Sequence, residues 1–494
     1  MRPVSVVLIL TDSQRKDLVG CYGLQQMITP NLDRLAAHGI RFTRAYTCQP
    51  VCSPARSALF TGLWPHTNGV WANNMALSAN VVTAAQRLSD HGILCGYIGK
   101  WHLDGTDYFG LGRAAPGWDP PTWYDMRNYV DELQPGDKQR SRTPSPSGAG
   151  ASDEFTFAHR CSNRAVEFLR RHADDSFFLV VSYDEPHHPH LAPSRFRDLY
   201  EGFTWDPHYR GRDDLTSKPE HQRLWGIDAR RGGPAPGATV TDFLACNSFV
   251  DHEIGRVLSA VDQYAPEALV IYTSDHGEFL GSHSLSLKGP AFYDEITNIP
   301  LIVRWPGHAP ASVVSDHLAS HIDIAPTLLD IFGLPAPRWC DGHSMGAFFA
   351  NPELPLNEFI FTEFGRYEVD HDGFGGFQPA RACCDGRYKL VINLLSSDEL
   401  YDLDADPGEV RNLIGDPSQS KTRSRLHRQL LDWMDRTRDP FRGYYWLDRP
   451  WADATSHVNW QSSGMTRQRE HDEYEPRQLD YDTGMEMVNA VRPK

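Results

Sequence analysis

The sequence lacks a long hydrophobic run near its start, and it lacks paired cysteine motifs. Its only apolar N-terminal run, residues 4–10, is too short to cross a bilayer, and no pattern of small residues typical of a cleavage site follows it. The nine cysteines are scattered and contain no Cys-x-x-Cys pair, which argues against a structural zinc site. We therefore expect a cytoplasmic protein with no membrane partner and with mostly buried, reduced thiols.

An excess of positive charge is also absent. The formal net charge is −16 at pH 7, and a field of this sign repels polyanions. We expect no nucleic-acid partner, and we expect local cations wherever an anionic ligand binds. With 494 residues, of which 40% are hydrophobic and 23% charged, the chain has the composition of a globular protein and a length that predicts two domains.

Three apolar runs end abruptly in polar residues. Each run is typical of a buried parallel strand, and ligands bind outside the carboxyl ends of such strands. The polar residues are therefore predicted to meet at one rim of a sheet. The three runs are residues 4–10, which precede Asp12; residues 177–182, which precede His187; and residues 268–273, which precede Asp275 and His276.

Stretches with helical spacing alternate with these runs. The alternation predicts an α/β fold with a large, open, mixed but mostly parallel sheet and helices on both faces. Residues 134–152 are rich in Pro, Gly and Ser and are predicted to form a surface loop. After Pro335, short alternating runs predict a smaller α+β domain with an antiparallel sheet. The predicted helices are 31–38, 81–91, 161–172, 243–261, 322–332 and 424–437, and the predicted C-terminal strands are 387–395 and 400–403.

The most informative stretch is Cys52-Ser-Pro-Ala-Arg56, followed by Thr61-Gly62. A helix that begins here would explain the proline at position 54, because proline is favoured in the first turn, but it would not explain the other residues of the stretch. The whole stretch resembles the Cys-x-Pro-x-Arg signature of the type I formylglycine-dependent sulfatases, which belong to the alkaline-phosphatase-like superfamily and include cytoplasmic bacterial enzymes. The resemblance implies that a formylglycine-generating maturation enzyme oxidises Cys52.

The chemistry of a formylglycine at position 52 can be argued separately from the resemblance. A hydrated aldehyde carries two hydroxyls on one carbon, so one can attack sulfur and the other can later expel sulfate as the aldehyde reforms. A serine or a cysteine thiolate has no second hydroxyl on the same carbon, so it could not expel the sulfate in this way. A helix N-terminus at Cys52 would add a positive dipole end for the sulfate, and Arg56, one turn on, is expected to brace the diol through a charge-assisted hydrogen bond.

The resemblance further implies a divalent cation held by Asp12, Cys52, Asp275 and His276. Alone, an aspartate at a strand end is usually a helix cap, and an Asp-His pair is usually a surface turn. Their predicted convergence on one rim favours a metal site. Calcium is the expected ion, with magnesium and manganese as alternatives.

This chain departs from the family pattern directly after the first metal-binding acid. Many sulfatases have a second acid there, whereas this chain has Ser13 and then Gln14. One formal charge fewer weakens a site for a hard cation. Either residue is a candidate for completing the coordination sphere.

Four basic residues match the family's sulfate-binding groups. Gly99-Lys100-Trp101-His102 resembles a Gly-Lys-x-His element, which implies that Lys100 holds sulfate and that His102 is the base for sulfate expulsion. By the same resemblance, His187 faces the ester oxygen and Lys288 holds the leaving group. Single lysines are usually solvated and single histidines are usually structural. The assignment therefore depends on all four residues occurring in the family's order.

The substrate is less constrained by the sequence. Polar and aromatic residues near the predicted rim suit a sugar ring, although loop residues of this kind are as often plain surface. A small-molecule or oligosaccharide sulfate ester is expected, with aryl sulfates as surrogates. The substrate-binding candidates are Asn74, Trp101, Asp104 and Arg366, the last on a charged loop that runs on to His371.

The resemblance implies a catalytic domain at residues 1–345 and a small antiparallel-sheet subdomain at 346–438. Residues 439–494 have no clear periodicity and are expected to pack as an irregular tail on the body or on a neighbouring subunit of a homo-oligomer. Two other functions stay open. A phosphonate monoester or phosphodiester hydrolase shares the fold, the formylglycine and the Asp-His pair. A catalytically inactive binding module is disfavoured by the intact set of basic residues.

Overall fold

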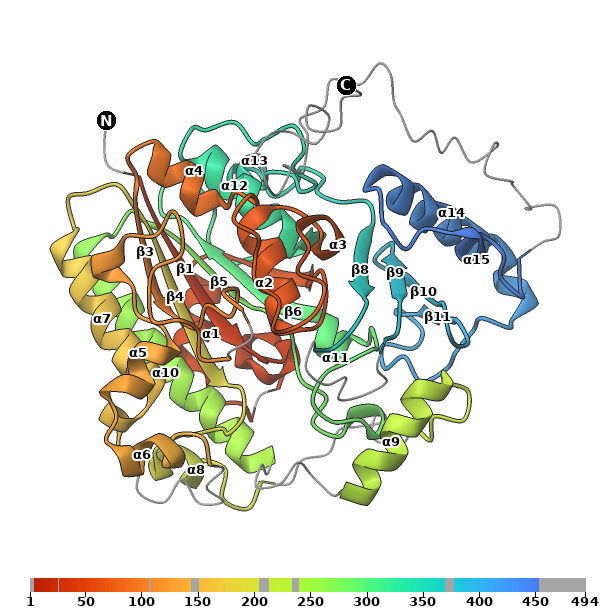
Figure 1. Cartoon of the computed structure of the whole chain (residues 1–494), viewed down its shortest axis with the longest axis horizontal. Coiled ribbons are helices and arrows are strands. Elements are labelled where there is room, and N and C mark those ends of the chain that lie inside the picture. The colour runs from red at the N-terminus through yellow and green to blue at the C-terminus, as the bar shows by residue number, and fades with distance from the viewer. Residues whose placement is uncertain are drawn as a thin grey trace, which may run out of the picture.

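The computed structural model describes residues 4–452, except residue 25 and the ranges 106–107, 144–150, 204–212, 233–239 and 369–376. Across this described part of the chain, no helix has both the length and the apolar character that a membrane span requires. The described residues form two sheets with helices packed against them (Figure 1).

The larger sheet has seven strands in the order β3-β4-β1-β5-β6-β2-β7. All neighbouring pairs are parallel except those of β6, which runs antiparallel to both β5 and β2. The predicted mixed, mostly parallel sheet is confirmed. The strands are β1 Ser5–Asp12, β2 Ile40–Tyr46, β3 Leu94–Gly99, β4 Phe177–Pro186, β5 Leu269–Ser274, β6 Asn298–Arg304 and β7 Val313–Ser320.

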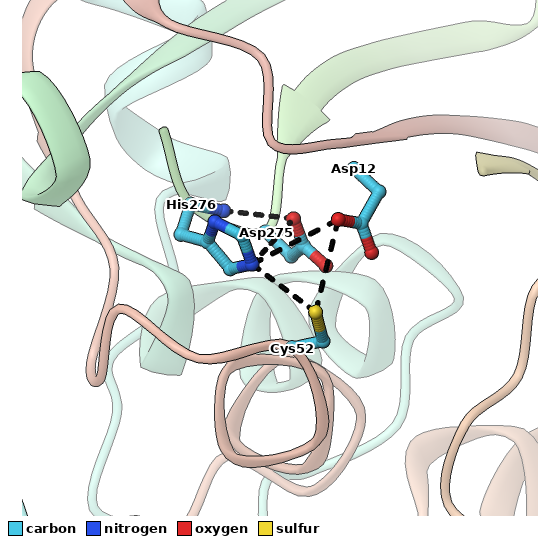
Figure 2. Close-up of side chains that lie close together, drawn as sticks. All are labelled: Asp12, Cys52, Asp275 and His276. Atoms are coloured by element: carbon cyan, nitrogen blue, oxygen red, sulfur yellow. Dashed lines mark hydrogen bonds and ion pairs between the residues drawn. The ribbon is translucent and has the colours of Figure 1, made fainter. Parts of the chain in front are cut away.

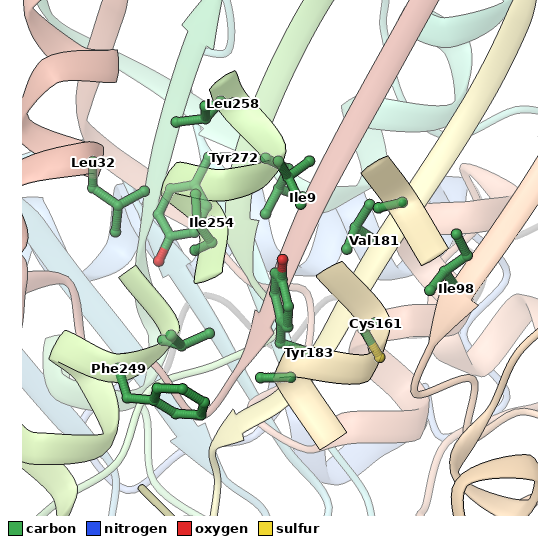
Figure 3. Packing of buried hydrophobic residues seen from close by; sticks show 14 of the residues in the cluster. Ile9, Leu32, Ile98, Cys161, Val181, Tyr183, Phe249, Ile254, Leu258 and Tyr272 are labelled. Atoms are coloured by element: carbon green, nitrogen blue, oxygen red, sulfur yellow. The ribbon is translucent and has the colours of Figure 1, made fainter. Parts of the chain in front are cut away.

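Helices cover both faces of this sheet, as predicted. Because side chains alternate along a strand, Val7 and Ile9 of β1 pack with one set of helices, whereas Leu8 and Leu10 pack with the other. Figure 3 shows part of the first core, where Ile9 lies close to Ile254 of α10. The first set is α1 Pro30–Ala37, α7 Phe157–Arg171 and α10 Val240–Tyr264, and the second is α2 Cys52–Thr61, α4 Ala84–Asp90 and α12 Ile324–Ile331.

The strands β4, β1 and β5 are adjacent and parallel, so their carboxyl ends meet at one rim. Asp12 of β1 is in register with Pro186 of β4, and Thr11 is in register with Ser274 of β5. The prediction that three strands deliver polar residues to the same rim is therefore confirmed.

The second sheet is antiparallel throughout and has the order β11-β10-β9-β8. The sequence predicted two of these strands, and β8 and β9 were not predicted. Apolar residues of α14 Ser420–Arg436 pack against the sheet. We call these strands, α14, α15 and their loops the C-terminal region. The strands are β8 Ile360–Phe364, β9 Ala380–Cys384, β10 Tyr388–Asn393 and β11 Glu399–Asp402.

The segment 134–152, predicted as a surface loop, contains a short helix. α6 Pro135–Arg140 begins at a proline, where the missing N–H removes no intrahelical bond. The loop prediction was wrong for these residues, and 144–150 lie outside the described part of the chain. The remaining α-helices of the described residues are α3 Pro65–Asn68, α5 Met126–Glu132, α8 Ser194–Asp198, α9 Glu220–Gly232, α11 Asp294–Thr297, α13 Gly346–Ala350 and α15 Tyr444–Leu447.

Residues 439–452, the first part of the predicted tail, pack on α14 and the second sheet. Trp446 of α15 is 1% exposed and lies in the same core as Leu430 of α14. Arg449 forms an ion pair with Asp398 at 2.7 Å. The tail beyond Ala452, with its predicted contact to a neighbouring subunit, lies outside the described residues.

Candidate active site

Cys52 is the first residue of α2, and every residue of that helix is buried. Its Sγ lies 3.2 Å from Nε2 of His276 and 3.2 Å from Nζ of Lys288. The first turn of a helix has N–H groups without intrahelical partners. Asn73 satisfies one of them, because its Oδ1 accepts a hydrogen bond from the backbone N–H of Ser53 at 2.9 Å. The helix start at Cys52 is therefore held by a residue outside the helix.

Asp12, Cys52, Asp275 and His276 point toward one another at the sheet rim (Figure 2), and one donor atom from each lies within 4.8 Å of the others. Nδ1 of His276 donates to the carbonyl of Gly277 at 2.8 Å, which leaves the Nε2 lone pair facing the cluster. Burial and the neighbouring Asp12 raise the pKa of the Asp275 carboxyl to about 8. A cation between the carboxylates would relieve this repulsion, so the donor set fits a divalent metal ion.

Ser13 and Gln14, the candidates for completing the metal site, have other partners. Oγ of Ser13 donates to Oδ1 of Asp12 at 2.9 Å. Nε2 of Gln14 donates to the carbonyls of Arg15 and Leu18 at 3.2 and 3.1 Å. Ser13 thus orients a candidate ligand, and the Gln14 amide is bound to the backbone.

Arg56 braces the two metal-site carboxylates. Its Nε donates to Asp275 at 3.0 Å, and its Nη2 donates to Asp12 at 3.1 Å. Nη1 donates to the carbonyl of Lys100 and to Oγ of Ser182, both at 2.8 Å. The expectation that Arg56 braces the diol itself stays a prediction, and in this structure its donors bond to the surrounding scaffold.

Lys100 lies between two carboxylates. Its Nζ is 2.8 Å from Asp12 and 3.0 Å from Asp184, and it donates to the Tyr108 hydroxyl at 2.9 Å. Burial opposes the charge, but Asp12 and Asp184 together raise the pKa of Lys100 well above its ordinary value. The sequence analysis did not assign Asp184 or Tyr108. Asp184 follows a predicted strand and could have been noted, whereas nothing in the pattern around Tyr108 marks it.

His187 and Lys288 form a pair beside Cys52. Nζ of Lys288 is 3.2 Å from Nε2 of His187. Nδ1 of His187 lies 2.9 Å from the carbonyl of His188, which can only accept, so Nδ1 carries the ring hydrogen. Burial and His188 lower the pKa of His187 well below its ordinary value. The neutral ring therefore accepts a hydrogen bond from the charged lysine.

His102 is buried beside Lys100, with a positive φ of 59°. Its Nε2 lies 3.5 Å from Oδ1 of Asn74. Burial, with Lys100 and Arg56, lowers the pKa of His102 well below its ordinary value, so the ring is neutral. A neutral imidazole in this position can accept a proton.

The four substrate-binding candidates have different surroundings. Asn74 lies at the rim beside His102, and the partly exposed Arg366 lies in the loop that follows β8. Oδ2 of Asp104 accepts the backbone N–H of Leu111 at 2.9 Å and so supports a loop. Trp101 is 3% exposed, and its ring packs on aromatic residues of the core, so its assignment to substrate binding stays a prediction that this packing does not support. These aromatic residues are Phe60, Tyr97, Trp118 and Trp123.

Comparison with known protein families agrees with this geometry. The sulfatase family model matches residues 5–334. The chain belongs to the sulfatase family. It is thus a sulfuric ester hydrolase of alkaline-phosphatase-like fold. A second model, the C-terminal part of N-sulphoglucosamine sulphohydrolase, matches residues 283–436 of this sulfatase.

Individual relatives of this sulfatase span nearly its whole length. It is 44% identical to the uncharacterized sulfatase YidJ of Escherichia coli (strain K12), covering 98% of this chain and 97% of the relative. It is 25% identical to an N-acetylglucosamine-6-O-sulfatase of Bacteroides thetaiotaomicron, covering 87% and 85%. The phosphonate monoester hydrolase of Agrobacterium radiobacter superposes with a TM-score of 0.72, covering 88% and 96%, and at 23% identity this likeness concerns the fold alone.

Proposed function

We propose that this sulfatase hydrolyses sulfate monoesters of carbohydrates through a formylglycine made from Cys52, with a divalent cation, calcium expected, bound at the rim. The observation that carries the proposal is the position of Cys52, whose Sγ lies 3.2 Å from Nζ of Lys288 and within the cluster of Asp12, Asp275 and His276. Burial and Asp12 raise the pKa of the Cys52 thiol to about 12, so it is not a thiolate at neutral pH. A buried thiol of this kind is a poor nucleophile, which supports its conversion to another group.

Hydrated formylglycine would supply one hydroxyl to attack sulfur and a second whose deprotonation expels sulfate. Lys288 lies beside residue 52, and Lys100 contacts Asp12 of the same cluster at 2.8 Å. Both lysines are charged and are placed to balance the charge of the sulfate oxygens. Because Nε2 of His187 accepts a hydrogen bond from Lys288, we assign the proton for the departing oxygen to Lys288. His187 orients the lysine, and His102 is the base for sulfate release.

A carbohydrate substrate is supported by the relatives. One relative is named for N-acetylglucosamine 6-sulfate, and the C-terminal model is named for sulphoglucosamine. The competing proposal is a phosphonate monoester or phosphodiester hydrolase, because such an enzyme shares the fold. Sulfated mono- and oligosaccharides, an aryl sulfate, an aryl phosphonate and an aryl diester should be assayed side by side. The sulfatase proposal fails if kcat/KM for the phosphonate or the diester exceeds that for every sulfate.

Peptide mass spectrometry of active protein should show residue 52 as an aldehyde instead of a thiol. Cys52→Ala should remove turnover, because no other side chain in the cluster offers the paired hydroxyls. Cys340→Ala, which alters a partly buried thiol away from the cluster, is the matched control and should leave turnover unchanged. Full activity of a protein whose residue 52 is entirely unmodified cysteine would contradict the mechanism.

Removal of the metal should lower both activity and thermal stability. A ligand that binds only the folded state stabilises it by about 2.7 kcal/mol at 100 times its Kd. Calcium, magnesium and manganese should each be titrated into chelated protein by calorimetry, and Tm should be followed in parallel. Asp12→Ala should abolish the binding heat, whereas Asp137→Ala, which breaks a surface ion pair with Arg140, should retain it. Equal binding by both variants would place the cation elsewhere.

A further inference from the structure

The loop after β8 reaches across from the C-terminal region to the active-site rim. The backbone N–H of Asn73 donates to the carbonyl of Tyr367 at 3.0 Å, and Asn73 forms an isolated bridge with Glu368. The side chain of the same asparagine caps the helix that begins at Cys52. Asn73 therefore links the C-terminal region directly to the start of the helix at Cys52.

The next residue, Asn74, makes a second connection. It has a positive φ of 61°, a conformation that asparagine adopts more readily than most residues. Its Nδ2 donates to Oε1 of Glu368 at 2.9 Å. Because an ionised carboxylate only accepts, the bond fixes which end of the amide faces Glu368 and turns Oδ1 toward His102.

The orientation of Asn74 determines where His102 carries its hydrogen. A carbonyl oxygen only accepts, so the ring nitrogen that faces it, Nε2, is the protonated one. The ring is neutral, so Nδ1 has a free lone pair. Nδ1 is buried and has no hydrogen-bond partner among the described residues, and the whole side chain is 3% exposed. A buried nitrogen without such a partner is available to a group of the reaction.

We propose that Glu368 and Asn74 are positioning residues that hold His102 as its Nε2–H tautomer, so that Nδ1 is the base of the sulfate-release step. The role of the base rests on the proposed function. In that step Nδ1 takes the proton of the remaining hydroxyl, the aldehyde C=O forms, the bond from that carbon to the sulfate oxygen breaks, and sulfate leaves. The C-terminal region is then part of the catalytic apparatus.

The tautomer can be observed without substrate. Long-range ¹H–¹⁵N correlation spectra of full-length protein labelled at its 22 histidines, compared with His102→Gln, isolate the His102 signals. Wild type should show a protonated Nε2. Glu368→Ala and Asn74→Ala should show the Nδ1–H form or a mixture. Glu368→Gln keeps an acceptor for Asn74 and should restore the wild-type pattern, and Glu358→Ala, an exposed carboxylate just before β8, should match wild type.

Pre-steady-state kinetics supply the second measurement. With an aryl sulfate, Glu368→Ala should slow the phase after the burst by about 10- to 100-fold, a typical effect of removing a group that orients a catalytic side chain, and should leave the burst unchanged. A protonated Nδ1 in wild type, or an unchanged tautomer and second phase in Glu368→Ala, would overturn the proposal. Absence of sulfate turnover in wild type would instead count against the proposed function, because the spectra do not depend on it.

Discussion

Replacing His102 with alanine is expected to leave alcohol release intact and to stop rapid turnover. Attack on sulfur and departure of the alcohol depend on Lys100, Lys288 and the metal-site residues, none of which contacts His102 through a hydrogen bond in the described structure. Release of sulfate needs the base. Loss of a positioned general base slows its own step by about 10²–10⁴-fold, enough to make that step limiting.

Rapid-quench measurements should therefore show a burst of aryl alcohol that approaches one equivalent per modified site. Intact mass should show the sulfate still attached to residue 52. His38→Ala is a suitable control, because His38 is an exposed histidine at the end of α1, far from the rim. A slower burst with no sulfated protein would assign His102 to sulfate binding instead.

Replacing Arg56 with methionine should destabilise the fold as well as remove activity. Arg56 is fully buried and holds Asp12 and Asp275 at 3.1 and 3.0 Å. Without it Asp275 loses this charged partner, whereas Asp12 still pairs with Lys100. Breaking a buried pair in this way costs about 3–5 kcal/mol. Urea unfolding followed by tryptophan fluorescence should show an earlier midpoint for Arg56→Met than for wild type.

Two further variants separate charge from geometry. Arg56→Lys keeps the charge but cannot donate to both carboxylates and to the backbone at once, so it should recover part of the stability and little activity. Arg170→Met removes an exposed arginine that pairs with Glu167 on the surface of α7, and it should unfold like wild type. An unaltered unfolding midpoint for Arg56→Met would mean that the carboxylates do not need the arginine.

The parts of the site that lie at strand ends were predictable from sequence. Asp12 and Asp275 follow continuous apolar runs, and parallel strands necessarily bring their ends together. The Cys52 to Arg56 stretch was found because its residue types and their spacing match the sulfatase signature. Both kinds of signal are local, so they did not depend on knowing which loops fold over the rim.

The parts contributed by loops were harder to predict. Trp101 was assigned to the substrate because it lies between Lys100 and His102, but its ring packs in the core while both neighbours serve the rim. Tyr108 belongs to a loop without periodicity, and its contacts with Lys100 and Asp184 exist only after folding. Glu368 lies in the charged loop that follows β8, and no sequence spacing links it to Asn74.

The burial of Cys52 also has a consequence for the order of events during biosynthesis. The cysteine is 1% exposed and lies in a helix whose ten residues are all buried, so no other protein can reach the sulfur once this helix has docked. If Cys52 is oxidised as proposed, the oxidation must precede the docking of the helix. The fraction of converted molecules in a preparation then depends on the rate of oxidation by the modifying enzyme relative to the rate of folding of the nascent chain. Chains that fold first stay inactive for as long as they remain native.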